Sequence, residues 1–233
     1  MVKSIVEIKN VSKSYGKKQV LKNVSFSIPS GKIIGLIGKN GMGKTTLIKL
    51  ISGLLRPDQG QIRIEQENPG PVSKALVSYL PERTYLDRSM RVDEVLRYFR
   101  DFYKDFDFSK ANRLICDLGL DLNMKIGSMS KGMQEKFQLI LVMSRKAKLY
   151  ILDEPLGGVD PATRDYILDT ILSNFDEGSS ILISTHMIAD IERILDEVVI
   201  LEEGEVKLIE EADELRTGNN CSIDEYFRRT YAW

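Results

Sequence analysis

The stretch GKNGMGKTT, residues 38–46, combines flexible backbone with a lysine and two hydroxyl side chains. It fits the pattern G-x-x-x-x-G-K-[ST], whose glycines allow successive backbone N–H groups to turn towards phosphate oxygens. In such a loop Lys44 would reach the β- and γ-phosphates of a polyphosphate, and the Thr45 hydroxyl would ligate Mg²⁺. A glycine turn with an incidental lysine is the simpler alternative. The apolar run before the stretch and the helical spacing after it favour a phosphate-binding loop.

A pair of carboxylates, Asp153 and Glu154, follows the apolar residues of LYILDEP. Carboxylates at the end of a buried strand need a cation or hydrogen-bond donors to offset their lost hydration. Asp153 therefore suits Mg²⁺, directly or in the second sphere, and Glu154 suits the base that polarises an attacking water molecule. An isolated Asp-Glu pair would more simply be a solvated strand end, but the phosphate-loop pattern in the same chain favours catalysis.

The chain has one histidine, His186, which follows the apolar run ILIST. A lone histidine is more often structural than catalytic. Here it comes directly after a predicted parallel strand, at the edge where sheets of this kind bind their ligands. That position favours a contact between His186 and the γ-phosphate.

The elements that must position these residues follow from hydrophobic periodicity. Alternation predicts two strands across residues 4–28 with a turn at SYGKK, and the apolar run 32–38 predicts a strand buried on both faces. Further strands are expected at residues 61–65, 75–80, 149–155 and 179–185, with a hairpin around Glu203-Gly204. Helical spacing is found from Gly43 to Leu55 and predicts further helices at residues 92–106, 109–120, 131–147, 161–175, 187–195 and within 222–233.

Strand–helix alternation at both ends of the chain, with a helical insert between them, predicts an α/β fold. It would consist of a core with a parallel sheet, an antiparallel β portion and a helical subdomain. Lys+Arg 33 against Asp+Glu 34 gives a net charge of −1, which argues against nucleic acid as the main partner. Two cysteines are too few for a disulfide framework, so a reducing cytosol is expected. The apolar runs are too short to span a bilayer, so a membrane role would require a partner.

Taken in this order, these segments resemble the ATP-binding cassette (ABC) family, the ATPase subunits of ABC transporters. The resemblance covers roughly residues 5–215, and its most specific part is SMSKGMQEKFQLILVMSRKAKLYILDEPLGGVDP. It implies an ABC-type P-loop ATPase domain over residues 1–217, with the helical subdomain inserted at about 84–145. Residues 218–233 would form a C-terminal tail, expected as a short helix.

The resemblance also assigns roles to residues. Ser130 and Gly132 match the signature segment, Asp160 the D-loop aspartate and His186 the switch histidine, while Tyr15 matches the aromatic that stacks on adenine. The phosphates of ATP would lie against the loop residues Gly38, Asn40, Gly41, Gly43, Lys44, Thr45 and Thr46. Mg²⁺ would be held by Thr45, Asp153 and Glu82.

The resemblance implies partners as well. Two ATPase subunits, identical or paralogous, would bind head to tail. Each ATP would lie between the phosphate loop of one subunit and the signature segment of the other subunit. A transmembrane permease would dock on the helical subdomain and hold the cytoplasmic ATPase at the inner face of the membrane. Nucleic acid is not an expected partner.

Three positions depart from the family pattern. Lys131-Gly132-Met133 replaces the usual Gly-Gly-Gln, and Gly157 replaces the usual D-loop serine. Glu82 replaces the glutamine that begins the Q-loop, where it would ligate Mg²⁺ or orient water. Glutamate at that position and the sequence SKGM resemble export-type members of the family. Alternatives are a non-transport ABC ATPase acting on ribosomes or DNA, and another P-loop enzyme such as a nucleotide kinase.

Overall fold

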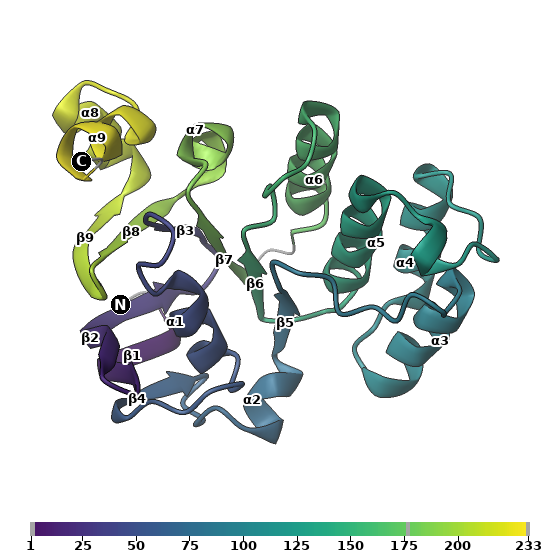
Figure 1. Cartoon of the computed structure of the whole chain (residues 1–233), viewed down its shortest axis with the longest axis horizontal. Helices are drawn as coiled ribbons and strands as arrows, with labels where there is room; N and C mark the ends of the chain where they lie inside the picture. The colour runs from purple at the N-terminus through teal and green to yellow at the C-terminus, as the bar shows by residue number, and fades with distance from the viewer. Residues whose placement is uncertain (1–2, 176–177, 232–233) are drawn as a thin grey trace.

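The larger sheet of the molecule carries the segments that the sequence singles out. A computed structural model of the chain describes residues 3–175 and 178–231, and within them six strands form this sheet in the order β5-β6-β7-β3-β8-β9 (Figure 1). The strands are β3 (Ile33–Ile37), β5 (Val77–Leu80), β6 (Leu149–Asp153), β7 (Ser180–Thr185), β8 (Glu197–Glu202) and β9 (Glu205–Glu211). All pair in parallel except β9, which forms the predicted hairpin with β8. The predicted α/β core is therefore confirmed.

The smaller sheet is antiparallel, and helix α1 packs against it. In this sheet β1 (Ser4–Tyr15) lies between β2 (Lys18–Pro29) and β4 (Gln59–Ile64). Its inward side chains share one buried cluster with strands of the larger sheet and with α1 (Lys44–Ile51). Leu47, Ile48 and Ile51 of α1 are fully buried in this cluster. Because α1 is packed between the two sheets, its first turn is held firmly at the end of β3.

A helical lobe lies beyond β5 and has its own core (Figure 1). It contains α3 (Val92–Phe102), α4 (Phe108–Asp117), a 3₁₀ turn (Ile126–Ser128) and α5 (Lys131–Met143). The buried side chain of Arg145 joins this lobe to the sheet. Its guanidinium forms an ion pair with Asp105 at 3.0 Å and donates to the carbonyl oxygens of Ala75 and Val77.

Helices from the C-terminal half of the chain cover the other face of the larger sheet. They are α6 (Pro161–Ser173), α7 (Ile188–Ile191), a 3₁₀ turn (Glu192–Ile194), α8 (Ala212–Asn219) and α9 (Ile223–Tyr231). α8 continues across residue 217, and α9 packs Ile223 and Phe227 into the same cluster as β6 and β7. The last residues, 232–233, lie outside the described part of the chain. Within the described ranges, no helix has the length and apolar character needed to cross a membrane.

The structure differs from the predicted elements at several boundaries. The helix predicted over residues 92–106 ends at Phe102, since the chain then turns to bring Asp105 to Arg145. The helix predicted over 187–195 is only α7 followed by a 3₁₀ turn. The short helix α2 (Pro71–Ala75) and α8 were not predicted. In each case the hydrophobic pattern is too short or is overridden by a contact that is distant in sequence.

Candidate functional site

The phosphate-loop pattern forms the turn between β3 and α1. Gly43 precedes the first residue of α1 with φ of 105°, a conformation that side chains other than glycine rarely adopt. A Cβ at Gly43 would also lie 2.8 Å from Leu21 Cδ2. The first turn of α1 contains no acidic residue. The N–H groups at this helix end can therefore bind an anionic ligand without repulsion from a neighbouring carboxylate.

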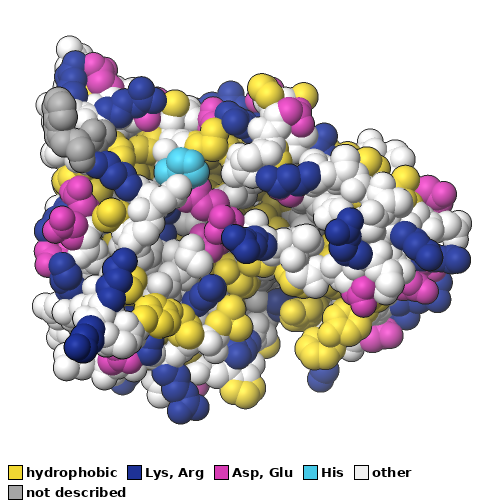
Figure 2. Space-filling view, viewed as in Figure 1, with side chains coloured by type: hydrophobic (Ala, Val, Ile, Leu, Met, Phe, Trp, Pro, Cys, Tyr) yellow, Lys and Arg dark blue, Asp and Glu magenta, His cyan; other side chains and the backbone are white. Residues whose placement is uncertain are grey.

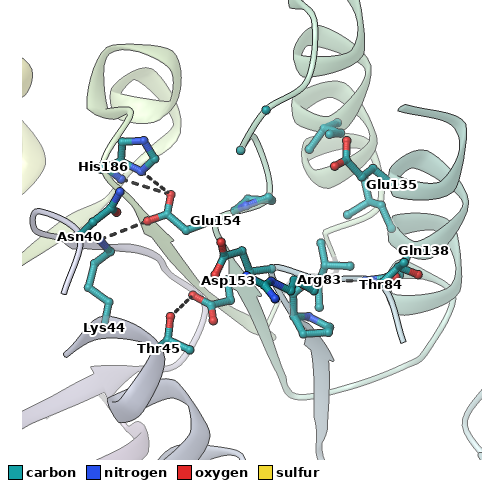
Figure 3. A pocket seen from close by; sticks show the side chains of 18 of the residues that line it. Asn40, Lys44, Thr45, Arg83, Thr84, Glu135, Gln138, Asp153, Glu154 and His186 are labelled. Atoms are coloured by element: carbon teal, nitrogen blue, oxygen red, sulfur yellow. Dashed lines mark hydrogen bonds and ion pairs between the residues drawn. The ribbon is translucent and has the colours of Figure 1, made fainter. Parts of the chain in front are cut away.

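Lys44 is buried, and its ammonium lies among oxygen atoms. Its Nζ donates to the Gly38 carbonyl oxygen at 2.5 Å and to the Lys39 carbonyl oxygen at 3.3 Å. It also forms an ion pair with Glu154 Oε1 at 3.1 Å (Figure 3). The side chain is only 5% exposed, so these oxygens supply the contacts that bulk water otherwise would.

Asp153 brings the loop and two neighbouring strands together. Its Oδ1 accepts from the Ser184 hydroxyl at 2.5 Å and from the Thr45 hydroxyl at 3.3 Å. Burial raises the pKa of the Asp153 carboxyl, and the hydrogen bonds from Ser184 and Thr45 oppose this. Its Oδ2 is buried and accepts no hydrogen bond from the described residues.

That orphaned oxygen beside a hydroxyl fits a divalent cation that takes its other ligands from phosphate and water. Among the described residues, no group of three or more His, Cys, Asp or Glu side chains could hold a metal by itself. Mg²⁺ characteristically binds with few protein ligands and several others, so the donor set of Thr45 and Asp153 agrees with the predicted ion.

Glu154 links Lys44 to His186. Its backbone has φ of 50°, an uncommon conformation for glutamate, and its N–H donates to Ser184 Oγ at 3.0 Å. The carboxylate Oε2 lies 2.9 Å from His186 Nδ1, while Oε1 faces Lys44. Sheet order explains this convergence, because β6, β7 and β3 are neighbours and all end at this edge.

A cavity of about 830 Å³ opens in front of these residues. Most of the predicted site residues line it, namely Asn40, Gly41, Gly43, Lys44, Thr45, Thr46, Glu82, Asp153, Glu154 and His186. Gly38 contributes through its carbonyl oxygen to Lys44. Tyr15 does not line the cavity: it ends β1 at the hairpin turn and is 49% exposed.

Ser130, Gly132 and Asp160 line a second, smaller cavity of about 570 Å³. Ser130 caps α5 by accepting from Met133 N at 3.2 Å, and Asp160 caps α6 by accepting from Thr163 N at 3.0 Å. The two helices begin side by side, since a Cβ at Gly132 would lie 3.2 Å from Thr163 Oγ1. The signature segment lies against the loop that follows Glu154, because Lys131 Nζ donates to the Gly158 carbonyl oxygen. Within one chain these residues are separate from the phosphate loop.

Several residues of the larger cavity were not predicted. Glu135 and Gln138 project from α5 on the side of the cavity opposite Lys44 and Glu154 (Figure 3). Gln138 is 3% exposed, and its Oε1 has no hydrogen-bond partner in the described chain. Polar residues at 131, 134, 135 and 138 follow helical spacing, a signal that could have identified this face. Ser184 was also missed, although it is a small polar residue in a buried strand.

Known proteins resemble this chain in both sequence and fold. Residues 21–157 match the family model described as ABC transporter. The chain is 31% identical to the ABC transporter ATP-binding protein YtrB of Bacillus subtilis (strain 168), over 91% of this chain and 74% of that protein. It is 30% identical to the SkfA peptide export ATP-binding protein SkfE of the same organism, over 87% of each. A solved ATP-binding subunit of an ABC transporter superposes with a TM-score of 0.87 at 32% identity, covering 97% of this chain and 99% of that one.

Proposed function

The chain belongs to the ATP-binding proteins of ABC transporters, and we propose that it powers export as one subunit of a head-to-tail ATPase pair. Proteins of this family bind and hydrolyse ATP, dimerise and work with transmembrane components. The observation that carries the proposal is the meeting of Lys44, Asp153 and Glu154 at adjacent strand ends. The relatives are named as transporter subunits, which favours transport over action on ribosomes or DNA.

ATP would bind with its phosphates against the N-terminus of α1. Lys44 would then exchange Glu154 for the β- and γ-phosphates, because a triphosphate is the stronger anionic partner. The exchange would leave the Glu154 carboxylate free to accept a proton from water, with His186 holding its other oxygen. Thr45 and Asp153 would hold Mg²⁺, which would neutralise charge on the phosphate oxygens. Glu82, at the cavity rim, would assist as a further ligand or orient water.

A second subunit would complete the nucleotide-binding site. Ser130, Gly132 and Asp160 line a cavity separate from that of the phosphate loop, which supports a role towards a partner's nucleotide. Backbone N–H groups at the start of α5 would supply anion-binding donors there. Tyr15, exposed at the hairpin, would stack on adenine.

Mixing two defective chains tests this arrangement. A Lys44→Ala chain and a Ser130→Arg chain should each have little ATPase activity alone. Their heterodimer has one composite site with both defects and one with none, so activity should reappear on mixing. ATPase rate against mixing ratio is the measurement, with heterodimer formation shown by differently tagged chains.

The matched control places both substitutions in one chain. A heterodimer of the doubly substituted chain with wild type has a defect in each composite site. The ATPase rate of this mixture should therefore be lower than that of the same amount of wild-type chain alone. If the separated pair forms heterodimers without recovering activity, the head-to-tail arrangement is wrong.

The helical lobe offers a surface for the transmembrane partner. Tyr85, Tyr98 and Phe102 are exposed large hydrophobic side chains, and the rings of Tyr98 and Phe102 stack with centroids 5.5 Å apart. Figure 2 shows hydrophobic side chains gathered at the lower edge of this lobe. Aromatic side chains of this kind are enriched at protein interfaces. Peptide export by SkfE supports an export direction for this chain.

Glu82 lines the larger cavity and begins the segment that leads into the helical lobe, so Glu82→Ala is proposed to uncouple ATP turnover from the transmembrane partner. ATP affinity should be retained because Lys44 and the loop amides remain. Stimulation of ATPase activity by the membrane partner should fall by at least about fivefold, a typical size for coupling between sites. Rates of the reconstituted transporter with and without substrate measure this. Glu67→Ala, at an exposed carboxylate outside the cavity, is the control, and full stimulation in Glu82→Ala would rule out a coupling role.

A further inference from the structure

The side chain of Lys131 reaches across from the helical lobe to the loop that follows Glu154. Lys131 is the first residue of α5. Its Nζ lies 3.4 Å from the Gly157 carbonyl oxygen and 3.3 Å from the Gly158 carbonyl oxygen. Gly158 has φ of 73°, a conformation that residues with a side chain rarely adopt, and a Cβ there would lie 2.5 Å from this Nζ and displace the end of the lysine side chain.

The same ammonium also faces a carboxylate on its own helix. Glu135 Oε1 lies 3.6 Å from Lys131 Nζ, one helical turn away. Burial raises the pKa of Glu135, and Lys131 opposes that shift. Glu135 Oε2 is buried and has no hydrogen-bond partner in the described ranges. Lys131 is thus the cation that Glu135 and the two loop carbonyls share.

The loop in question joins two residues of the proposed mechanism. It leaves β6 at Glu154 and reaches the cap of α6 at Asp160. Within it, Gly157 N donates to the Glu154 carbonyl oxygen at 3.0 Å. Lys131, a residue of the helical lobe, therefore contacts the loop at the turn that is hydrogen-bonded to Glu154.

We propose that Lys131 is a positioning residue that ties the loop 155–160 to the helical lobe of the same chain, so that movement of the lobe reorients Glu154. This role rests on the proposed ATPase function of Glu154. The three contacts are long and the side chain is 67% exposed, so the tie is weak and can be released.

Amide hydrogen exchange in the absence of nucleotide tests the tie directly. Lys131→Met keeps an unbranched side chain, one atom shorter, but removes the ammonium and its donors. Exchange of the segment 155–160 should become about 2- to 10-fold faster, the range expected for losing modest hydrogen bonds. Lys131→Arg should restore slow exchange. Lys125→Met, at an exposed lysine of the same lobe, should leave it unchanged.

Steady-state kinetics then test the consequence. Lys131→Met should lower kcat by about tenfold or more at unchanged KM for ATP, because displacing a catalytic group by about 1 Å costs up to 10²-fold. Lys131→Arg should recover most of kcat. Unchanged exchange combined with a raised KM would overturn the tie and assign Lys131 to a partner's phosphate instead. Faster exchange in Lys131→Met, combined with a wild-type chain that hydrolyses no ATP, would support the tie and reject the proposed function.

Discussion

Glu154→Gln is expected to lower ATP turnover by about 10²–10⁴ while ATP binding is retained, the usual cost of losing a general base. Glutamine keeps the size and hydrogen-bonding shape of the side chain, but it cannot take a proton from water. The contact with His186 at 2.9 Å can persist with an amide oxygen. Because uncleaved ATP would hold two subunits together, the variant should elute as a dimer in Mg²⁺ and ATP on size exclusion.

The control for this change is Glu203→Gln. Glu203 also adopts a left-handed backbone conformation, with φ of 49°, but it lies in the exposed β8–β9 turn. It should keep wild-type turnover and show no ATP-induced dimer beyond wild type. A Glu154→Gln chain that turns ATP over at the wild-type rate would remove Glu154 from the mechanism.

Lys44→Ala is expected to weaken ATP binding by about 10- to 100-fold, because it removes the charged donor that faces the β- and γ-phosphates. It also deletes the ion pair with Glu154 and leaves the Gly38 carbonyl oxygen without this donor. Turnover should fall with affinity. Equilibrium titration with a fluorescent ATP analogue, followed by an ATPase assay at saturating ATP, separates the two effects.

Lys49→Ala provides the matched control, since Lys49 is an exposed lysine in the last turn of the same helix. The control should bind the analogue as wild type does. The assignment fails if Lys44→Ala binds and hydrolyses ATP normally. A melting curve for each variant shows whether loss of the buried Lys44 ion pair has altered folding.

The sequence by itself was sufficient to identify the segments that carry the candidate chemistry. Each of these features consists of residues that are consecutive in the sequence, namely the phosphate loop, the Asp153-Glu154 pair and the strands that precede them. Glycine at position 43 is demanded by one backbone conformation, and continuous apolar runs are demanded by strands buried on both faces. Such constraints act over a few neighbouring residues, which is why they can be recognised without knowing the fold.

Only the tertiary structure decided which of these segments meet. The sheet order places β3 beside β7, with β6 next in line, and this order brings Lys44 within 3.1 Å of Glu154 from distant parts of the chain. The lobe's docking places Lys131, Glu135 and Gln138 on the cavity wall, where a sequence pattern shows only a partly polar helix face. These contacts result from packing between elements far apart in sequence, and periodicity within a single element carries no information about its neighbours.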